Sequence, residues 1–333
     1  MTIPDELETR AAALLAGDRR ALARAITLVE STREEHRLLA ETLVECLLPA
    51  TGRSIRIGIS GVPGVGKSTF IEAFGLHLIA AGRRVAVLAV DPSSKRTGGS
   101  ILGDKTRMTE LSRAEAAFIR PSPTGGTLGG VARRTREAIL LCEAAGFDLI
   151  IVETVGVGQS ETAVADMVDL FCLMLLPSAG DELQGIKKGI VELAELLVVN
   201  KADGATRPGA LQAVADYSSA LRLLRPLTHL WQPEVLAVSS VTGEGLDKVW
   251  AAIGRHEQAL TESGEKAARR AAQAQAALWA DLGGGLIASL RRRPDIARDI
   301  PGIEAAVRAG TMTPMAGARR LLALFMGEGG RSA

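Results

Sequence analysis

The segment that most constrains the fold of this chain is residues 61–68, which read GVPGVGKS and match the pattern Gly-x-x-x-x-Gly-Lys-Ser. The alternating, β-branched residues 55–60 predict a strand before it, and residues 69–81 carry apolar side chains at helical spacing after it. A strand, a glycine turn and a helix aim backbone N–H groups and a helix N-terminus at phosphate. We therefore predict a phosphate loop that binds a nucleotide, through Gly61, Val62, Pro63, Gly64, Val65, Gly66, Lys67, Ser68 and Thr69.

Two side chains of this loop are predicted to act on the phosphates. Lys67 should reach the β- and γ-phosphates and serve catalysis there, and the Ser68 hydroxyl should bind Mg²⁺. The glycines let the backbone approach an anion closely and take up positive φ where the turn needs it.

The composition is that of an ordinary globular protein. The 333 residues are 47% hydrophobic, and a net charge of +1 gives no reason to expect nucleic acid or an anionic membrane as partner. Cys46, Cys142 and Cys172 lie far apart in apolar segments, which predicts buried thiols instead of disulfides or a metal cluster. The acidic first residues, and the lack of an uncharged apolar run of about 18 residues, predict neither a signal peptide nor a membrane span. We expect a cytoplasmic protein.

The apolar pattern divides the chain into three parts. Residues 1–53 show helical spacing without strand signals, with Gly17 and Asp18 ending one helix and capping the next. Residues 54–262 alternate strands with helices, which is typical of an α/β P-loop NTPase with a mainly parallel sheet covered on both faces. Further strands are predicted at residues 85–90, 148–153, 170–176, 196–199 and 235–238, and helices at residues 131–146, 208–224 and 245–260.

The third part, residues 263–333, is helical again. Residues 265–293 carry a long apolar stripe, and Thr313 with Pro314 begins a last helix as N-cap and first residue. A stripe of this length needs a surface to cover it, so we predict a C-terminal arm that forms a homodimer. The basic residues of this part are not interleaved with aromatic ones, and we interpret them as a solvated face instead of an RNA site.

The choice of nucleotide is predicted by residues 200–203, which read Asn-Lys-Ala-Asp directly after a predicted strand. In GTPases with this pattern the Asp203 carboxylate would accept hydrogen bonds from the N1–H and N2–H₂ edge of guanine. Asn200 and Lys201 would hold the base and the phosphate loop together. Ser239, Ser240 and Val241 resemble the further loop whose backbone N–H meets guanine O6, so we predict GTP and GDP as ligands.

Carboxylates at predicted strand ends are candidate Mg²⁺ ligands beside Ser68. Asp91 and Glu153 each end an apolar run, and Asp104 lies in a loop-like segment beyond the first of them. Mg²⁺ prefers hard oxygen ligands, and ligands of open α/β sheets bind at the carboxyl ends of the strands. The alternative for Asp91 is a turn or helix-capping residue.

Two further segments are predicted to sense the phosphates. Glu153 opens a stretch typical of a switch loop, and Gln159 either orients water or is a solvated switch residue. Residues 177–189 follow a buried strand and are either a plain loop or a third sensing loop, in which Lys187 and Lys188 make contacts. Because intrinsic hydrolysis without an arginine finger is slow, we expect a protein partner to stimulate it.

These segments together resemble the MeaB/ArgK GTPases, in the SIMIBI group of P-loop proteins. The resemblance rests on residues 61–68, 90–94, 98–105, 153–160, 180–189 and 200–203 and extends over nearly the whole chain. It implies a homodimeric, Mg²⁺-dependent GTPase that acts as a chaperone of methylmalonyl-CoA mutase. Such a protein couples GTP hydrolysis to adenosylcobalamin loading and protects the mutase. It also implies that residues 177–189 couple the mutase to hydrolysis, through Asp181, Gln184, Lys187 and the catalytic Lys188.

Two alternatives remain open at this point. A GTP-dependent metallochaperone for another metalloenzyme would need metal ligands, but the nickel-delivery relatives carry Cys/His clusters that this chain lacks. A phosphotransferase (kinase) would need an acceptor site and a base near the γ-phosphate, and no Asp or His outside the GTPase motifs suggests one. Val62 stands where the dimeric ATPase class carries lysine, which also favours a GTPase chaperone.

Overall fold

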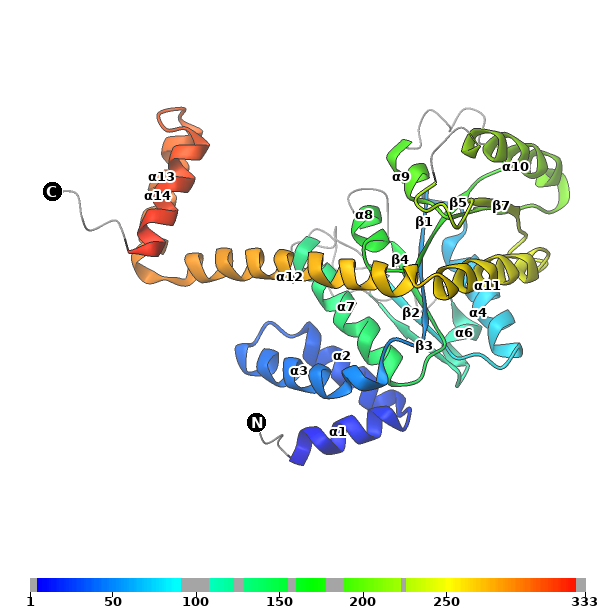
Figure 1. Ribbon diagram of the computed structural model, residues 1–333, viewed down its shortest axis with the longest axis horizontal. Coiled ribbons are helices and arrows are strands. Elements are labelled where there is room, and N and C mark those ends of the chain that lie inside the picture. The colour runs from blue at the N-terminus through cyan, green and yellow to red at the C-terminus, as the bar shows by residue number, and fades with distance from the viewer. Residues whose placement is uncertain are drawn as a thin grey trace. The chain divides into compact units, whose positions relative to one another are not determined.

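The computed structural model describes residues 5–90, 108–121, 128–154, 160–177, 188–222 and 226–327 (Figure 1). The chain forms two compact units, Met1–Gln273 and Ala274–Ala333. The long helix α12 (Glu265–Arg292) begins in the first unit and ends in the second.

The first unit is built on a seven-stranded sheet whose strands are all paired in parallel, in the order β3-β2-β4-β1-β5-β6-β7. The strands are β1 (Ile55–Gly61), β2 (Val85–Val90), β3 (Ala117–Arg120), β4 (Leu149–Thr154), β5 (Leu170–Leu175), β6 (Leu196–Val199) and β7 (Glu234–Ala237). The central strands are buried, mostly apolar runs, as expected when helices cover both faces of a parallel sheet. The predicted α/β P-loop fold is confirmed.

Alternate residues of the strands enter two separate cores, one on each face of the sheet. One face packs against α4 (Lys67–Ala80), α6 (Thr109–Arg113) and α11 (Leu246–Glu262). The other face packs against the N-terminal helices, α7 (Leu128–Ala144), α8 (Ser160–Ala165) and α10 (Arg207–Leu221). At β2, for example, Val87 enters the first core and Leu88 enters the second.

The N-terminal segment consists of α1 (Asp5–Leu15), α2 (Arg19–Glu30) and α3 (Glu34–Leu47), followed by the 3₁₀ turn η1 (Leu48–Ala50). Gly17 has a φ of 80°, and the Asp18 carboxylate accepts hydrogen bonds from the N–H groups of Arg20 and Ala21. The predicted helix break and N-cap are therefore confirmed. These helices share one continuous core with α7 and the sheet.

Several short elements were not predicted from the sequence. Strand β3 has four residues and lies at the edge of the sheet, where it pairs with β2 alone. The helices α6, α8 and α9 (Lys188–Leu193) have six residues or fewer. Such lengths hold too few residues to show a hydrophobic period. The remaining differences are end shifts of one to three residues, such as α7 beginning at Leu128 instead of residue 131.

The second unit contains the end of α12, α13 (Pro294–Arg308) and α14 (Pro314–Met326). Thr313 is the N-cap of α14 as predicted, with its side chain accepting from Ala316 N–H. Helix α13, also not predicted, buries Ile296 and Ile303, and its partner Gly317 lies so close that an added Cβ would stand 3.1 Å from Ile303. No helix among the described residues is long and apolar enough to span a membrane.

All three cysteines are free thiols. Cys142 and Cys172 are buried as predicted, whereas Cys46 is half-buried. Burial raises the pKa of the Cys172 thiol to about 12, so the group is a neutral part of the core at physiological pH.

Candidate nucleotide-binding site

The phosphate loop lies between the carboxyl end of β1 and the first residue of α4. Gly64 and Gly66 have φ values of 81° and 92°, in the region that favours glycine. A Cβ at Gly66 would stand 2.7 Å from the Asn200 side-chain nitrogen, and a Cβ at Gly61 would stand 2.6 Å from the Met174 carbonyl oxygen. Gly61 and Gly66 are therefore required because a side chain at either position would collide with a neighbouring segment, in addition to the demands of the turn.

Lys67 lies across its own loop. Its Nζ donates a hydrogen bond to the Gly61 carbonyl at 2.7 Å. Burial lowers the pKa of the Lys67 ammonium, and the carboxylates of Glu153 and Glu161 partly offset this effect. A partly desolvated cation with two nearby carboxylates is placed to exchange its carbonyl partner for a phosphate oxygen.

Asn200 joins the segment predicted to bind the base to the phosphate loop. The side chain is 2% exposed, and its Nδ2 donates to the Val65 carbonyl at 2.9 Å. Its Oδ1 accepts from the N–H of Ser240 at 3.3 Å and from the Ser240 hydroxyl at 2.7 Å. One buried amide thus connects three segments that lie far apart in the sequence.

Lys201 makes a second link to the same loop. Its Nζ donates to the Gly64 carbonyl at 2.8 Å, and its backbone has a φ of 60°, the only positive value at a non-glycine residue among those described. Asp203 is half-buried and precedes a short 3₁₀ helix, Gly204–Thr206.

The loop at residues 239–241 lies directly beside Asn200. Ser239 is fully buried and its hydroxyl accepts from the Thr242 N–H at 3.1 Å, whereas the Val241 side chain is 80% exposed. The structure therefore joins the two segments predicted to contact guanine through the hydrogen bonds between Asn200 and Ser240, and Lys201 joins the first of them to the phosphate loop.

The side-chain oxygens of Ser68, the residue after Lys67, and Glu153 lie next to each other. The Ser68 hydroxyl donates to Glu153 Oε1 at 3.5 Å, and Glu153 is 4% exposed at the end of β4. Behind them Thr154 donates through its hydroxyl to Ser60 at 2.9 Å. Mg²⁺ prefers oxygen ligands such as a hydroxyl and a carboxylate, so Ser68 and Glu153 fit the predicted metal. Among the described residues no three His, Cys, Asp or Glu side chains form a metal-binding group.

Several predicted site residues lie outside the described residues. These are Asp91, Asp104, Gln159, Asp181, Gln184 and Lys187. Lys188 is the first residue of α9, but its side chain is not described.

Glu161 is a buried carboxylate near Lys67 that the sequence did not predict as a site residue. Its side chain is 1% exposed in the first turn of α8, and its charge acts on Lys67. An acidic residue in the first turn of a helix is common because it complements the helix dipole, so the sequence offered no signal for a second role.

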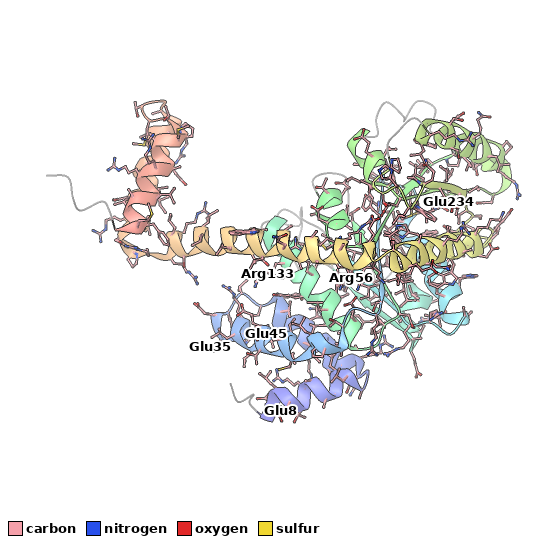
Figure 2. The ribbon with its side chains drawn as sticks, viewed as in Figure 1. Glu8, Glu35, Glu45, Arg56, Arg133 and Glu234 are labelled. Carbon is pink, nitrogen blue, oxygen red and sulfur yellow. The ribbon has the colours of Figure 1, made fainter. Side chains whose placement is uncertain are left out.

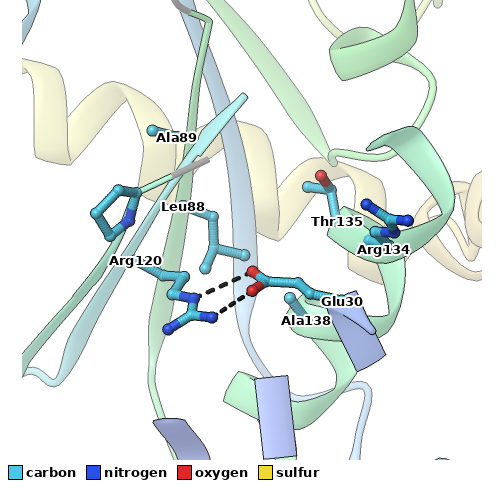
Figure 3. A pocket seen from close by; sticks show the side chains of 8 residues that line it. Glu30, Leu88, Ala89, Arg120, Arg134, Thr135 and Ala138 are labelled. Atoms are coloured by element: carbon cyan, nitrogen blue, oxygen red, sulfur yellow. Dashed lines mark hydrogen bonds and ion pairs between the residues drawn. The ribbon is translucent and has the colours of Figure 1, made fainter. Parts of the chain in front are cut away.

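A small pocket beside β2 is lined in part by an ion pair (Figure 3). Glu30, at the end of α2, accepts from Arg120 Nε at 3.1 Å and from a second guanidinium nitrogen of the same residue. Leu88 and Ala89, near the carboxyl end of β2, also line this pocket. The pair ties the N-terminal helices to the sheet edge instead of leaving room for a ligand.

Comparison with known proteins places these features in a family. Residues 22–294 match the family model described as "Methylmalonyl Co-A mutase-associated GTPase MeaB". A protein named "Putative GTPase" from Caulobacter vibrioides is 59% identical over 321 residues, covering 96% of this chain and 97% of that protein. The Mus musculus protein named "Methylmalonic aciduria type A homolog, mitochondrial" is 48% identical over 322 residues, covering 94% of this chain and 78% of that protein.

One solved structure is similar over nearly its full length. It is described as "Crystal structure of LAO/AO transport system kinase" and has 41% sequence identity and a TM-score of 0.77. The match covers 98% of this chain and 100% of that chain.

Proposed function

The chain belongs to the MeaB family of GTP-hydrolysing P-loop proteins, and on this premise we propose that it is a chaperone of methylmalonyl-CoA mutase. As a member of this family the chain is a GTPase. In the proposal, GTP binding and hydrolysis drive the loading of adenosylcobalamin and protect the mutase from inactivation. The observation that carries the proposal is the match of residues 22–294 to a family described as mutase-associated.

The proposed hydrolysis uses the residues gathered around the phosphate loop. Lys67 would leave the Gly61 carbonyl and neutralise charge that develops on the γ-phosphate. Ser68 and Glu153, with Asp91 and Asp104, would hold Mg²⁺. The metal supplies charge neutralisation on the phosphate oxygens when it is bound. Gln159 is our candidate for orienting the attacking water.

Guanine selectivity is proposed to depend on Asp203. Loss of its negative charge removes two charge-assisted hydrogen bonds to guanine, each worth about 1.5–3 kcal/mol. We expect Asp203→Asn to weaken GTP binding by at least tenfold, measured by calorimetry, without weakening ATP binding. An equal loss for both nucleotides would contradict the assignment. The variant Asp216→Asn, on the exposed side of α10, is the control for a change of charge alone.

Coupling to the partner is proposed to run through residues 177–189. The test is the GTPase rate with and without methylmalonyl-CoA mutase. We expect the mutase to raise it, and we expect Lys188→Ala to remove this stimulation while GTP affinity stays unchanged. Equal rates with and without the mutase would overturn the chaperone proposal. Stimulation that survives Lys188→Ala would remove Lys188 from the coupling and leave the proposal itself standing.

We also propose that residues 263–333 form a homodimer. Among the described residues, the part of α12 beyond Gln273 exposes a set of large apolar side chains: Leu278, Trp279, Leu282, Leu286 and Ile287. Such a set is unusual on a free helix surface, and a second copy would cover it. Trp279→Glu should produce monomers in sedimentation equilibrium, with Arg291→Glu as the control at a polar position of the same helix.

A kinase activity is the second candidate, because the similar solved structure is described as a transport system kinase. Incubation with γ-labelled GTP and the mutase separates the two proposals. Label recovered only as inorganic phosphate supports hydrolysis. Label on a protein or a small molecule supports phosphotransfer.

A further inference from the structure

An ion pair, which we call the surface pair, joins residues 200–207 to residues 239–245, the two segments of the proposed guanine site. Arg207, the first residue of α10, donates to the two carboxylate oxygens of Glu244 at 2.7 and 2.8 Å. Two parallel hydrogen bonds between a guanidinium and a carboxylate fix orientation as well as distance. The two side chains are 52% and 55% exposed. Substitution of either residue therefore leaves the core of the first unit intact.

Helix α10 itself gives no reason for arginine at position 207. The N-terminus of a helix carries partial positive charge, which disfavours a cation there. The first turn of α10 contains no acidic residue that would offset this effect. Because Glu244 supplies that negative charge from the other segment, the arginine is explained by the surface pair and not by its own helix.

Each of the two segments is a turn held by its own hydrogen bonds. In the first, the Thr206 hydroxyl lies within hydrogen-bond distance of the carbonyls of Lys201 and Asp203. In the second, the Ser239 N–H donates to the Glu244 carbonyl at 3.0 Å. Because each turn is braced internally, the distance between the two turns depends on the bonds that join one to the other.

The two turns are joined at their beginnings by buried contacts and at their ends by the surface pair. At the beginnings, the Asn200 amide bonds Ser240, and the Ala202 N–H donates to the Val238 carbonyl at 3.0 Å. Asp203, which is predicted to recognise guanine, lies in the sequence between these contacts and the surface pair. Opening of the surface pair therefore frees the ends of the turns while their beginnings stay joined.

We propose that Arg207 and Glu244 are positioning residues of the guanine site, whose ion pair keeps the two turns together and opens when a guanine nucleotide is released. This role rests on the guanine site proposed above, since Asp203 lies in one turn and Val241 in the other. Neither Arg207 nor Glu244 has to touch the base. An exposed ion pair of good geometry contributes up to about fivefold to an equilibrium or a rate, so the surface pair slows release without preventing it.

Release of GDP from the full-length chain tests this role. The chain is loaded with GDP that carries a fluorescent N-methylanthraniloyl group on its ribose, and excess unlabelled GDP displaces it. We expect Arg207→Gln and Glu244→Gln each to release the nucleotide roughly three- to fivefold faster than the wild type. The double variant should release it no faster than either single variant, because all three lack the same pair. Unchanged release in both single variants, or two effects that multiply in the double variant, would overturn the proposal.

Salt and a matched ion pair separate positioning from a general loss of stability. Raising the ionic strength from about 0.05 M to about 1 M screens an exposed pair, so wild-type release should approach that of the double variant. The control Arg255→Gln breaks the exposed pair with Glu234 between β7 and α11, and it should leave release unchanged. A difference between wild type and double variant that does not shrink with salt would contradict the proposal, as would equal acceleration in the control.

Asp203→Asn distinguishes failure of this role from failure of the guanine site. A selective loss of GTP affinity in Asp203→Asn, together with wild-type release in the surface-pair variants, would leave the guanine site standing and remove the pair from it. An equal loss of GTP and ATP affinity in Asp203→Asn would refute the guanine assignment, and the positioning role would fail with it.

Discussion

The most informative single substitution in the first unit is Arg270→Met. Its partner Asp169 also accepts a hydrogen bond from the backbone N–H of Arg56, a residue labelled in Figure 2. Arg270 donates to Asp169 Oδ1 at 2.7 Å and Oδ2 at 2.6 Å, and also to the carbonyls of Gly52 at 2.9 Å and Ser54 at 2.7 Å. Asp169 is 1% exposed. After the substitution Asp169 keeps the Arg56 backbone N–H, at 2.8 Å, as a donor, but its charge has lost its cationic partner in the interior.

The expected loss is large because one partner of a buried pair is removed. Breaking such a pair costs about 3–5 kcal/mol, against a typical total stability of about 5–15 kcal/mol. Urea denaturation followed by circular dichroism measures the loss. The control is Arg255→Met, which removes a guanidinium that has one terminal nitrogen 2.8 Å from both oxygens of Glu234, at an exposed site. There we expect a loss below about 1 kcal/mol.

The pH dependence gives a second, independent check. Burial by itself raises the pKa of Asp169, but Arg270, together with the smaller effects of Lys266 and the Arg56 backbone N–H, more than offsets it and holds the pKa below its usual value. In the wild type this stability is present above the ordinary pKa of an aspartate, about 3.9, and is lost as the pH falls through the lowered value. In Arg270→Met burial dominates and raises the pKa of Asp169. The difference in stability between the two proteins should then shrink as the pH falls from about 7 towards about 4.

Two outcomes would refute this reasoning. One is a loss no larger than that of Arg255→Met. The other is a loss that does not change between about pH 7 and about pH 4. The double variant Asp169→Asn, Arg270→Met removes both charges and should recover part of the loss, because a neutral amide is less costly to bury than an unpaired carboxylate.

Further predictions concern the phosphate loop. Gly66→Ala places a Cβ 2.7 Å from Asn200 Nδ2 at a φ of 92°, so we expect at least a tenfold loss of GTP affinity by calorimetry. In the control Gly64→Ala the residue has a similar φ of 81°, but its added Cβ meets nothing within 4 Å, so we expect only backbone strain of about 1 kcal/mol and a smaller loss of GTP affinity. An equal loss of GTP affinity in the two variants would contradict the steric argument. Asn200→Ala leaves the Val65 carbonyl and the Ser240 donors without their partner, and should lower the free energy of unfolding by about 1–3 kcal/mol in urea denaturation. Asn200→Asp replaces the donor to the Val65 carbonyl by a repelling oxygen, so it should be no more stable than Asn200→Ala.

What the sequence could predict depends on how far apart the interacting residues lie. The phosphate loop, the buried strands and the Asp18 and Thr313 caps are specified by neighbours within a few residues, and their patterns were readable. Arg270 lies 101 residues from Asp169 and 218 residues from Gly52, and a basic residue on a long helix reads as solvated. The same holds for the pair of Arg120 with Glu30, 90 residues away. No local pattern distinguishes a buried partner of this kind from a surface charge.

The contacts at the two ends of β1 bear on how the protein responds to nucleotide. β1 is the central strand, paired to β4 on one side and β5 on the other. Its first residues are held by Asp169, and the carbonyls just before it by Arg270. Its last residue, Gly61, leads into a loop that Asn200 and Lys201 fasten from the side. A strand fixed at both ends and along both edges is a poor candidate for a moving part, so the phosphate loop should act as a fixed support. A structural response to the γ-phosphate must then arise in the segments that follow the other strands, which is where the sequence places Asp91, Gln159 and Lys188.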